Sequence, residues 1–340
     1  MHRCIIHFII MTRLTLTSLL GRVSLGSSLD QVGQRVTSEY SLGELLKIKP
    51  MFVGYEELNC LLITSSGRYV IKIFSKYKDK QTIDSNVKAL IEFYKGGVPV
   101  PKLYKNTSGE YLYRLYDSTH TYVIVMDFFD GQKFTEISPT AQDMLNVIGI
   151  LVQIHSLSFS THANYDMWLT IHLPREFEDK KKYLVSQDLD LIQPVVNKIS
   201  LIDFSQLSKS IVHFDLHREN VMKNKKGEYC ILDLASVDYN YTIFDIGTFI
   251  ALFCFDLIGD PSAFPKVLKG VLKEYLRHRS LSDYEQAMLP DVVAAAYAAN
   301  VLIPAFLQKT GSDENPKQTI YYQHLGRGGL KMLESIKLSI

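Results

Sequence analysis

Four side chains capable of acid-base chemistry or metal binding lie together in the stretch SIVHFDLHRENVMKNKKGEYCILDLA, residues 210–235. They are His213, Asp215, Asn220 and Asp233. The residues around them are largely apolar, and burying an unpaired carboxylate costs far more free energy than a neighbouring Val or Ile contributes. A structural cap or ion pair would account for Asp215 beside a histidine, but for neither Asn220 nor Asp233. The cluster therefore predicts a site with a chemical function.

The spacing of these residues favours phosphoryl transfer. That reaction needs a carboxylate to orient the attacking hydroxyl group and hard oxygen ligands to hold Mg²⁺ against the phosphates. Asp215 and Asn220 are five residues apart on a loop predicted to precede a strand, in the pattern H-x-D-x-x-x-x-N of a kinase catalytic loop. Asp233 follows at the end of the next predicted strand, where a second metal-binding aspartate belongs.

Upstream of this stretch, the pattern predicts a sheet. A helix is expected to end near Val36, and the run 40–74 that follows is rich in β-branched and aromatic residues around an SSG turn. Apolar residues then recur at helical spacing from Thr82 to Tyr94, and GGVPVP ends that helix. EYLYRL and TYVIVMDFF predict two more strands. We expect five strands, with one helix after the third.

After DGQKF the pattern becomes helical. The segment SPTAQDMLNVIGILVQIHSL opens with a Ser-Pro cap signal and carries apolar residues on one face. A short hairpin around NKKGE is the exception, with Asn224 and Gly227 as turn residues. Four later segments predict helices, namely TIFDIGTFIALFCF, PKVLKGVLKEYLRH, EQAMLPDVVAAAYAANVLIPAF and KQTIYYQHLGRGGLKMLESI.

Composition sets the broad class. With 340 residues, 46% of them hydrophobic, the chain can form a substantial core in two packed units, and a formal net charge of +1 gives no reason to expect a nucleic-acid partner. Its four cysteines have no metal-ligand spacing, so we expect a reducing cytoplasm. The opening MHRCIIHFIIM is too short to span a bilayer, with a weak signal peptide as the alternative. The most apolar later run, 243–258, contains two aspartates and predicts a buried helix, so no membrane partner is expected.

The stretches IVHFDLHRENVM, ILDLA and YTIFDIGTF resemble the aminoglycoside phosphotransferase and choline kinase-like superfamily, and the run 40–74 is similar to its homoserine kinase-like branch. The resemblance covers residues 29–306. It implies an α+β, bilobal protein kinase-like fold, with a small five-stranded antiparallel N-lobe carrying one main helix and a larger, mainly helical C-lobe. It also implies an N-terminal extension over 1–27, a nucleotide-binding N-lobe over 28–129, and a C-lobe with the catalytic loop and acceptor site over 130–340.

The resemblance assigns roles to the residues of the stretch 210–235. Asp215 matches the catalytic base, and His213 matches the histidine that braces the loop backbone. Asn220 and Asp233 match the Mg²⁺ ligands. Asp245 matches a structural aspartate early in the following helix.

The resemblance also implies a nucleotide site for ATP. Lys72, in YVIKIF, matches the lysine that contacts the nucleotide phosphates, although a lysine alone is common in edge strands. MDFFDG matches the hinge between the lobes, where the main chain of Asp127 to Phe129 would meet adenine and Met126 would pack nearby.

The sequence departs from the family pattern at three places. Gly54 is the only glycine of VGYEELNC, so a main-chain phosphate cradle there would be partial. Asn59 agrees with the homoserine kinase-like pattern, whereas Glu57 stands at a position of asparagine. Asn86 stands where the glutamate partner of Lys72 usually lies, and an uncharged amide would hold the lysine less firmly.

The function predicted from these features is that of an ATP-dependent, Mg²⁺-requiring kinase for a hydroxyl group of a small metabolite, such as an amino acid, an amino alcohol or an aminoglycoside. The alternative is a catalytically weak or inactive kinase-like protein that binds nucleotide or a partner. His217 and Arg218 are expected to face either substrate or solvent. The acceptor pocket is expected among the helices after Phe244, which offer Asp256, Asp260, Asp283, Glu285, Asp291 and Tyr297.

Overall fold

The computed structural model describes residues 16–52, 57–115, 121–162, 165–255, 261–313 and 315–336. They form two compact units. The N-terminal unit takes the described residues up to Lys95 together with Pro99–Gly131, and the C-terminal unit takes Gly96–Val98 and the described residues from Gln132 onward.

The N-terminal unit is built on one five-stranded antiparallel sheet, as predicted. Its strands, in the order β1-β2-β3-β5-β4, are β1 (Leu45–Met51), β2 (Leu58–Thr64), β3 (Gly67–Ile73), β5 (Tyr122–Asp127) and the very short β4 (Tyr113–Arg114). Two helices, α1 (Leu16–Gly21) and α2 (Leu29–Glu39), precede the sheet, and α3 (Lys80–Lys95) follows the third strand. α2 ends three residues beyond the predicted Val36 and starts with a capping box of Ser28 and Gln31.

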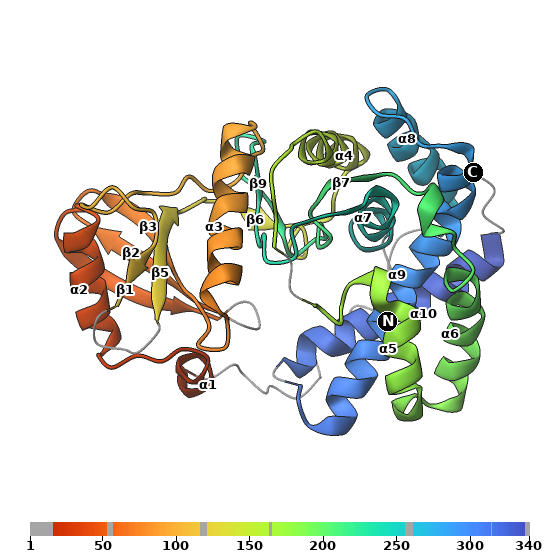
Figure 1. Ribbon diagram of the computed structural model, residues 1–340, viewed down its shortest axis with the longest axis horizontal. Coiled ribbons are helices and arrows are strands. Elements are labelled where there is room, and N and C mark those ends of the chain that lie inside the picture. The colour runs from red at the N-terminus through yellow and green to blue at the C-terminus, as the bar shows by residue number, and fades with distance from the viewer. Residues whose placement is uncertain are drawn as a thin grey trace. The chain divides into compact units, whose positions relative to one another are not determined.

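The sheet is covered by helices on both faces (Figure 1). Val32 and Val36 of α2 share a hydrophobic cluster with Val123 and Val125 of β5. Ile124, which points the other way because side chains alternate along a strand, belongs to the cluster that contains residues of α3. α2 and α3 therefore pack against opposite faces.

The strand register places Lys72 on the face covered by α3. In the antiparallel ladder Lys72 lies opposite Ile124 on one side and opposite Asn59 on the other. Directly opposed residues share a face of the sheet. Lys72 and Asn59 therefore lie on the same side as Ile124, towards α3.

The C-terminal unit is mainly helical, as predicted. Its long helices are α4 (Ala141–His155), α5 (Leu173–Lys180), α6 (Ser186–Ile199), α7 (Thr242–Phe249), α8 (Phe264–Leu276), α9 (Asp283–Thr310) and α10 (Pro316–Ile336). Sequence patterns had indicated all of these except α5 and α6. The cap of α4 is Thr140, in a capping box with Asp143, rather than the Ser-Pro pair before it.

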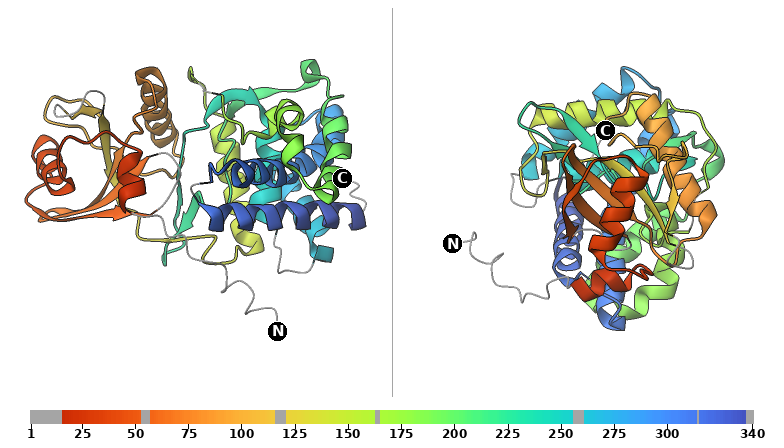
Figure 2. Two further views of the ribbon diagram at one scale, coloured as in Figure 1. Left: turned by 90° about the horizontal axis from the view of Figure 1, so that it is seen from below. Right: turned by 90° about the vertical axis from the view of Figure 1, so that its left-hand side faces the viewer.

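The helix α9 forms the centre of this unit. It lies beside α10 (Figure 2) and also contacts α6 and α7. It is long and apolar enough to cross a membrane, but 78% of its most apolar 18-residue window is buried inside the structure. That burial is typical of a core helix.

Short strands carry the chemically interesting stretch. β7 (Lys209–Val212) pairs with β10 (Asp238–Tyr241), and β8 (Val221–Lys223) lies between β6 (Gln132–Lys133) and β9 (Tyr229–Ile231). β8 and β9 form the predicted hairpin. Asn224 closes its turn by accepting backbone N–H groups of Lys226 and Glu228 at Oδ1.

Candidate active site

One buried carboxylate, that of Asp245, holds the backbone of the loop between β7 and β8. Asp245, near the start of α7, accepts the backbone N–H of His213 at 2.7 Å and that of Phe214 at 2.9 Å. Phe214 has φ +64°, a conformation that non-glycine residues rarely adopt. These two hydrogen bonds hold the backbone in that turn and satisfy two buried N–H groups.

Asp245 is itself oriented by a neutral histidine. His155 Nε2 lies 3.1 Å from Asp245 Oδ2, and its Nδ1 lies 2.9 Å from the Tyr275 hydroxyl. Complete burial lowers the pKa of His155, and this outweighs the opposing charge of Asp245. Because a carboxylate oxygen accepts, the neutral ring carries its proton on Nε2 and accepts the Tyr275 hydroxyl at Nδ1.

His213 is fully buried and contacts backbone groups on both sides of the loop. Its Nδ1 accepts the backbone N–H of Asp215 at 3.2 Å, and its Nε2 lies 3.2 Å from the carbonyl oxygen of Leu232. The ring thus links the loop between β7 and β8 to the end of β9. Its contacts are those of a brace, and a side chain with no exposed surface does not touch a substrate.

The carboxylate of Asp215 is the exposed group of this loop. Its side chain is 38% exposed. Asn220 Nδ2 donates to Asp215 Oδ2 at 2.6 Å and to its backbone carbonyl oxygen at 3.0 Å. His217 Nε2 lies 2.9 Å from Asp215 Oδ1. The carboxylate is therefore oriented on both oxygens while it stays open to solvent, as a group that receives a proton from a bound hydroxyl must be.

The sequence left open whether His217 and Arg218 face substrate or solvent. Both side chains are buried, so neither faces bulk solvent. His217 packs against Tyr322 of α10, with Nδ1 3.4 Å from the hydroxyl oxygen. Burial alone would lower the pKa of His217, but the charge of Asp215 and its hydrogen bond raise it overall. Arg218 Nε donates to the carbonyl oxygen of Phe253, in the π-helical turn Ile250–Cys254. Phe253 lies in the last turn of this helix, where carbonyl groups have no donor within the helix, so its carbonyl is free to accept from Arg218.

The two predicted metal ligands lie at one end of the β8–β9 hairpin. Asn220 immediately precedes β8, and Asp233 follows β9 by two residues. Leu232 donates its N–H to the carbonyl oxygen of Asn220 at 2.8 Å, which ties the two ends together. The side-chain bonds of Asn220 run through Nδ2, which leaves Oδ1 for another partner. Asp233 is exposed and has φ +57°, a conformation in which aspartate is enriched.

This pair fits Mg²⁺ by the chemistry of its donors. Carboxylate and amide oxygens are hard ligands, and Mg²⁺ at phosphates is held by one or two protein groups with the phosphates and water supplying the rest. Among the described residues, no group of three or more His, Cys, Asp or Glu side chains could hold a metal ion. A larger protein cage is therefore absent from that part of the chain.

In the N-terminal unit, Lys72 has a partner that the sequence did not indicate. Its Nζ lies 3.7 Å from Glu57 Oε2, while Glu57 Oε1 pairs with Nζ of Lys78. Asn86 of α3 is buried, and its Oδ1 has no hydrogen-bond partner among the described residues. The sequence does contain a hint of this pairing. Side chains alternate between the two faces of an extended chain, so Glu57, two residues before Asn59, is expected on the same face as Asn59, which lies opposite Lys72.

The predicted hinge lies at the end of β5. Met126 is half-buried and bridges to Leu103, and the N–H of Asp127 donates to the carbonyl oxygen of Lys102. The carboxylate of Asp127 accepts the Tyr104 hydroxyl at 2.6 Å. Phe129 accepts the N–H of Gly131 at its carbonyl oxygen. The predicted Gly54 lies outside the described residues.

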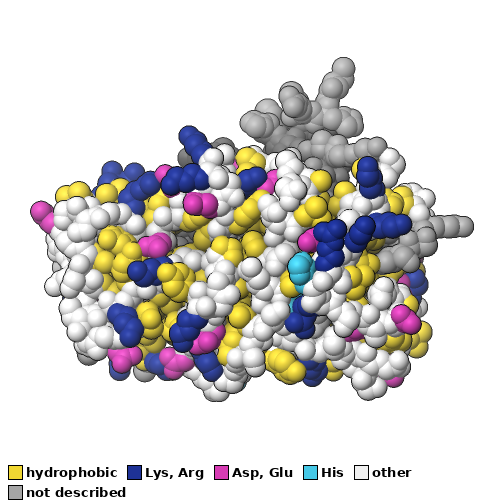
Figure 3. Space-filling model, turned by 90° about the horizontal axis from the view of Figure 1, so that it is seen from above, with side chains coloured by type: hydrophobic (Ala, Val, Ile, Leu, Met, Phe, Trp, Pro, Cys, Tyr) yellow, Lys and Arg dark blue, Asp and Glu magenta, His cyan; other side chains and the backbone are white. Residues whose placement is uncertain are grey.

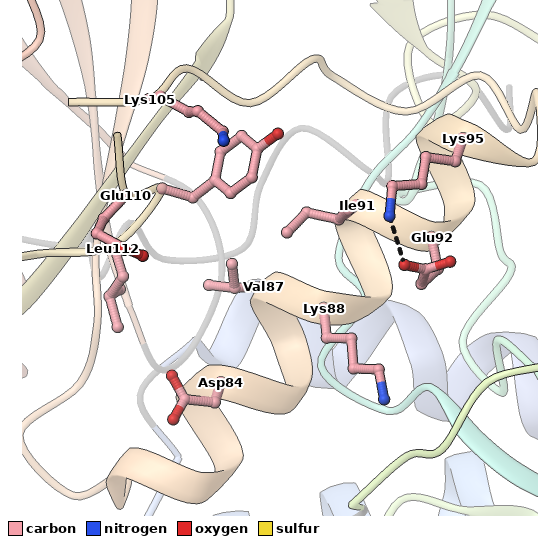
Figure 4. Close-up of a pocket in the computed structure, with 10 residues that line it drawn as sticks. Asp84, Val87, Lys88, Ile91, Glu92, Lys95, Lys105, Glu110 and Leu112 are labelled. Carbon is pink, nitrogen blue, oxygen red and sulfur yellow. Dashed lines mark hydrogen bonds and ion pairs between the residues drawn. The ribbon is translucent and has the colours of Figure 1, made fainter. Parts of the chain in front are cut away.

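A pocket of about 490 Å³ lies elsewhere in the N-terminal unit, between α3 and the segment 105–112 (Figure 4). Val87, Ile91 and Leu112 form its apolar part, with charged side chains around them. None of the predicted site residues lines it. It is therefore separate from the groups to which the sequence assigned chemistry.

Of the acidic residues proposed for the acceptor pocket, Glu285 and Asp291 have structural partners, and Asp283 is exposed in the first turn of α9. Glu285 belongs to the capping box of α9 and accepts the backbone N–H of Ser208. Asp291 pairs with the exposed Lys198 at 2.8 Å. Tyr297 is fully buried. Asp256 and Asp260 lie outside the described residues.

Comparison with known proteins decides the family. Residues 47–289 match the phosphotransferase enzyme family, a span that contains the loop of Asp215, the β8–β9 hairpin and Lys72. The chain belongs to this family. It is a small-molecule phosphotransferase of the kinase-like fold.

Individual phosphotransferases share modest sequence identity with this chain. A homoserine kinase of Methylobacillus glycogenes is 21% identical over 305 residues, 87% of this chain and 92% of its own. One of Bradyrhizobium diazoefficiens is 23% identical over 265 residues, 74% and 77% of the two chains.

Solved phosphotransferases share the fold. An amicoumacin kinase in complex with AMP-PNP, Ca²⁺ and its ligand has a TM-score of 0.65 at 16% identity, covering 92% of this chain and 95% of its own. A microcompartment-associated aminopropanol kinase has a TM-score of 0.65 at 15% identity, covering 90% and 98%. These structures are similar to this chain in fold, along nearly its whole length.

Proposed function

We propose that this phosphotransferase transfers the γ-phosphoryl group of ATP to a hydroxyl group of a small metabolite that carries an amine. The observation that carries the proposal is the carboxylate of Asp215, which is solvent-accessible and oriented on both oxygens. In the transfer, the bond between the γ-phosphorus and the bridging oxygen of ADP breaks, and a bond from the acceptor oxygen to phosphorus forms. Asp215 orients the hydroxyl group and receives its proton.

The other predicted residues would handle the nucleotide. Asn220 and Asp233 would hold Mg²⁺, which when bound neutralises charge on the phosphates. Lys72 would contact the phosphates, with Asn59 opposite it on the same face of the sheet. Gly54, five residues before Asn59 in the sequence, would contribute to the phosphate-binding loop.

The adenine contacts would come from the main chain at the end of β5. We assign them to Asp127 and Phe129, with Met126 packing nearby. These residues lie in sequence where the resemblance places the hinge.

The acceptor class rests on the relatives. Homoserine and aminopropanol, which appear in the names of similar proteins, both carry a hydroxyl group and an amine. On the face shown in Figure 3, Lys and Arg side chains are interspersed with acidic and hydrophobic ones, which suits a small-molecule enzyme better than a nucleic-acid partner. We place the enzyme in a reducing cytoplasm, since its cysteines at 60, 230 and 254 are buried free thiols.

The experiment is a panel of hydroxyl acceptors with purified protein, ATP and Mg²⁺, scored by ADP release. The panel includes homoserine, 1-amino-2-propanol, ethanolamine, choline and an aminoglycoside. With the acceptor that reacts, Asp215→Asn should lower kcat by about 100-fold or more, because it keeps the shape but removes the proton acceptor. The affinity for ATP should change by less than about tenfold.

Glu219→Gln is the matched control, because it removes a carboxylate of the same loop by the same isosteric exchange. The side chain of Glu219 is half-buried, and its carboxylate pairs with Lys133 at 3.4 Å. Its variant should keep kcat within about threefold, as a partly exposed ion pair contributes little. Full turnover by Asp215→Asn would contradict the assigned base.

The second candidate is a nucleotide-binding protein without turnover, which the amide at Asn86 favours. The carboxylate of Glu57 beside Lys72 counts against it, since the lysine does have an anionic partner. ATP binding without product from any acceptor of the panel would support this second function.

A further inference from the structure

The lysine of β3 lies in a site where its charge has to be balanced. The side chain of Lys72 is only 14% exposed, and its Nζ lies 5.9 Å from the ring centre of Phe74. An ammonium group in such surroundings is stable only with an anionic partner or good hydrogen bonds. A carboxylate on the α3 face of the sheet would meet this requirement.

Helix α3 does not supply it. Asn86 is the α3 residue at the position of the usual glutamate, and its amide oxygen is the only side-chain atom there that can accept from an ammonium group. That oxygen is buried and has no hydrogen-bond partner among the described residues. The partner of Lys72 must therefore come from another element.

Glu57 fills that role from the residue immediately before β2. Its side chain is 8% exposed, and its two oxygens are divided between two lysines, Oε2 to Lys72 and Oε1 to Lys78. Lys78 lies in the connection between β3 and α3, where its N–H donates to the carbonyl oxygen of Ser75. Glu57 is thus anchored by one lysine and directs the other. The three groups together carry a net charge of +1, which favours an anion.

We propose that Glu57 is the positioning residue for Lys72, in place of a glutamate on α3. The inference rests on the proposed contact of Lys72 with nucleotide phosphates. It assigns to Glu57 the task of holding the ammonium group in one orientation towards the phosphates, and it makes the amide at Asn86 compatible with an active enzyme.

A positioning role and a simple charge-balancing role for Glu57 predict opposite changes in ATP affinity when Glu57 is replaced by glutamine. If Glu57 only lowered the local charge, Glu57→Gln would raise that charge from +1 to +2 and tighten the binding of anionic ATP. If Glu57 positions Lys72, the same change should weaken binding of Mg·ATP, because the amide accepts less strongly than a carboxylate and its NH₂ group opposes an ammonium. We expect a Kd at least about tenfold higher, equivalent to about 1.4 kcal/mol.

The test is a double-mutant cycle read by calorimetric titration of the full-length protein with Mg·ATP. The proteins are the unmutated chain, Glu57→Gln, Lys72→Met and the double variant. Since Glu57 acts through Lys72, Glu57→Gln should change Kd by less than about twofold once Lys72 is methionine. The control is Asp84→Asn on α3, which removes a carboxylate from the exposed Lys80–Asp84 pair and should leave Kd unchanged.

A second variant keeps the charge and moves only the carboxylate. Glu57→Asp shortens the side chain by one methylene, so charge balance predicts an unchanged Kd and positioning predicts a weaker one. It also serves if Glu57→Gln does not fold, as judged by its melting curve.

Each outcome has one meaning. Equal or tighter binding by both Glu57 variants, or an undiminished Glu57→Gln effect in the Lys72→Met background, overturns the inference. Unchanged binding by Lys72→Met overturns the role of the lysine, and the inference falls with it. No binding of Mg·ATP by the unmutated protein overturns the proposed nucleotide use itself.

Discussion

Replacing Asp245 by asparagine should destabilise the C-terminal unit far more than such an exchange normally does. The side chain has no exposed surface, and both of its oxygens accept N–H donors, from His213, Phe214 and His155. An asparagine has one acceptor oxygen, so its NH₂ group must face at least one of these N–H groups. The NH₂ group of the asparagine and the N–H group that it faces are then both left without an acceptor.

The magnitude follows from counting these donors. Each buried polar group left without a partner costs about 1–3 kcal/mol, so the pair predicts a loss of about 2–6 kcal/mol in the free energy of unfolding. Typical domains have about 5–15 kcal/mol in total, so the loss is easily measured. The assay is denaturation by urea, followed by the fluorescence of Trp168, the single tryptophan of the chain.

The control is Asp291→Asn. Asp291 pairs with Lys198, whose side chain is 62% exposed, so its loss should cost less than about 1 kcal/mol. A cost below about 1 kcal/mol for Asp245→Asn as well would refute the view that this carboxylate holds the loop between β7 and β8.

The remaining predictions concern pH and packing. The pKa of His155 is lowered by burial, so below its unfolded pKa of about 6.5 the unfolded chain takes up a proton that the folded chain does not, and stability falls as the pH falls. His155→Gln should flatten the stability profile between about pH 5 and 7, and an unchanged slope would contradict the argument. Gly329→Ala should cost about 1–3 kcal/mol, because its Cβ would lie 2.4 Å from the buried ring of Tyr297. Gly270→Ala on α8, with no atom within 4 Å of the new Cβ, should instead stabilise by about 0.5–1 kcal/mol in the same urea assay.

The parts of the fold that could be predicted are those with a strong local pattern. The alternation in β2 and β3 and the SSG turn between them determine a hairpin, and the apolar spacing of α3, α4 and α9 determines helices. The helices α5 and α6 were not predicted from the sequence, and β4 is shorter than its apolar run indicates. Their form depends on tertiary packing, which overrides local preference.

In the candidate site, too, local sequence predicts some features, and others depend on tertiary contacts. The spacing of Asp215, Asn220 and Asp233 could be read directly, because a short loop and the hairpin that follows it bring them together. The burial of His217 could not, since it depends on Tyr322, 105 residues further along the chain. The pairing of Glu57 with Lys72 required the strand register as well as the residue types.

In the β8–β9 hairpin, the distance in space between Asn220 and Asp233 does not depend on their separation in the sequence. Asn220 and Asp233 lie at its open end, joined by the bond from the Leu232 N–H, while the turn around Asn224 lies at the opposite end. Adding residues in pairs at the turn would lengthen the ladder without changing how its open end closes. The distance in space between the two proposed ligands is therefore independent of the number of residues between them, and related chains are free to differ in that number while they keep the same pair of oxygen donors.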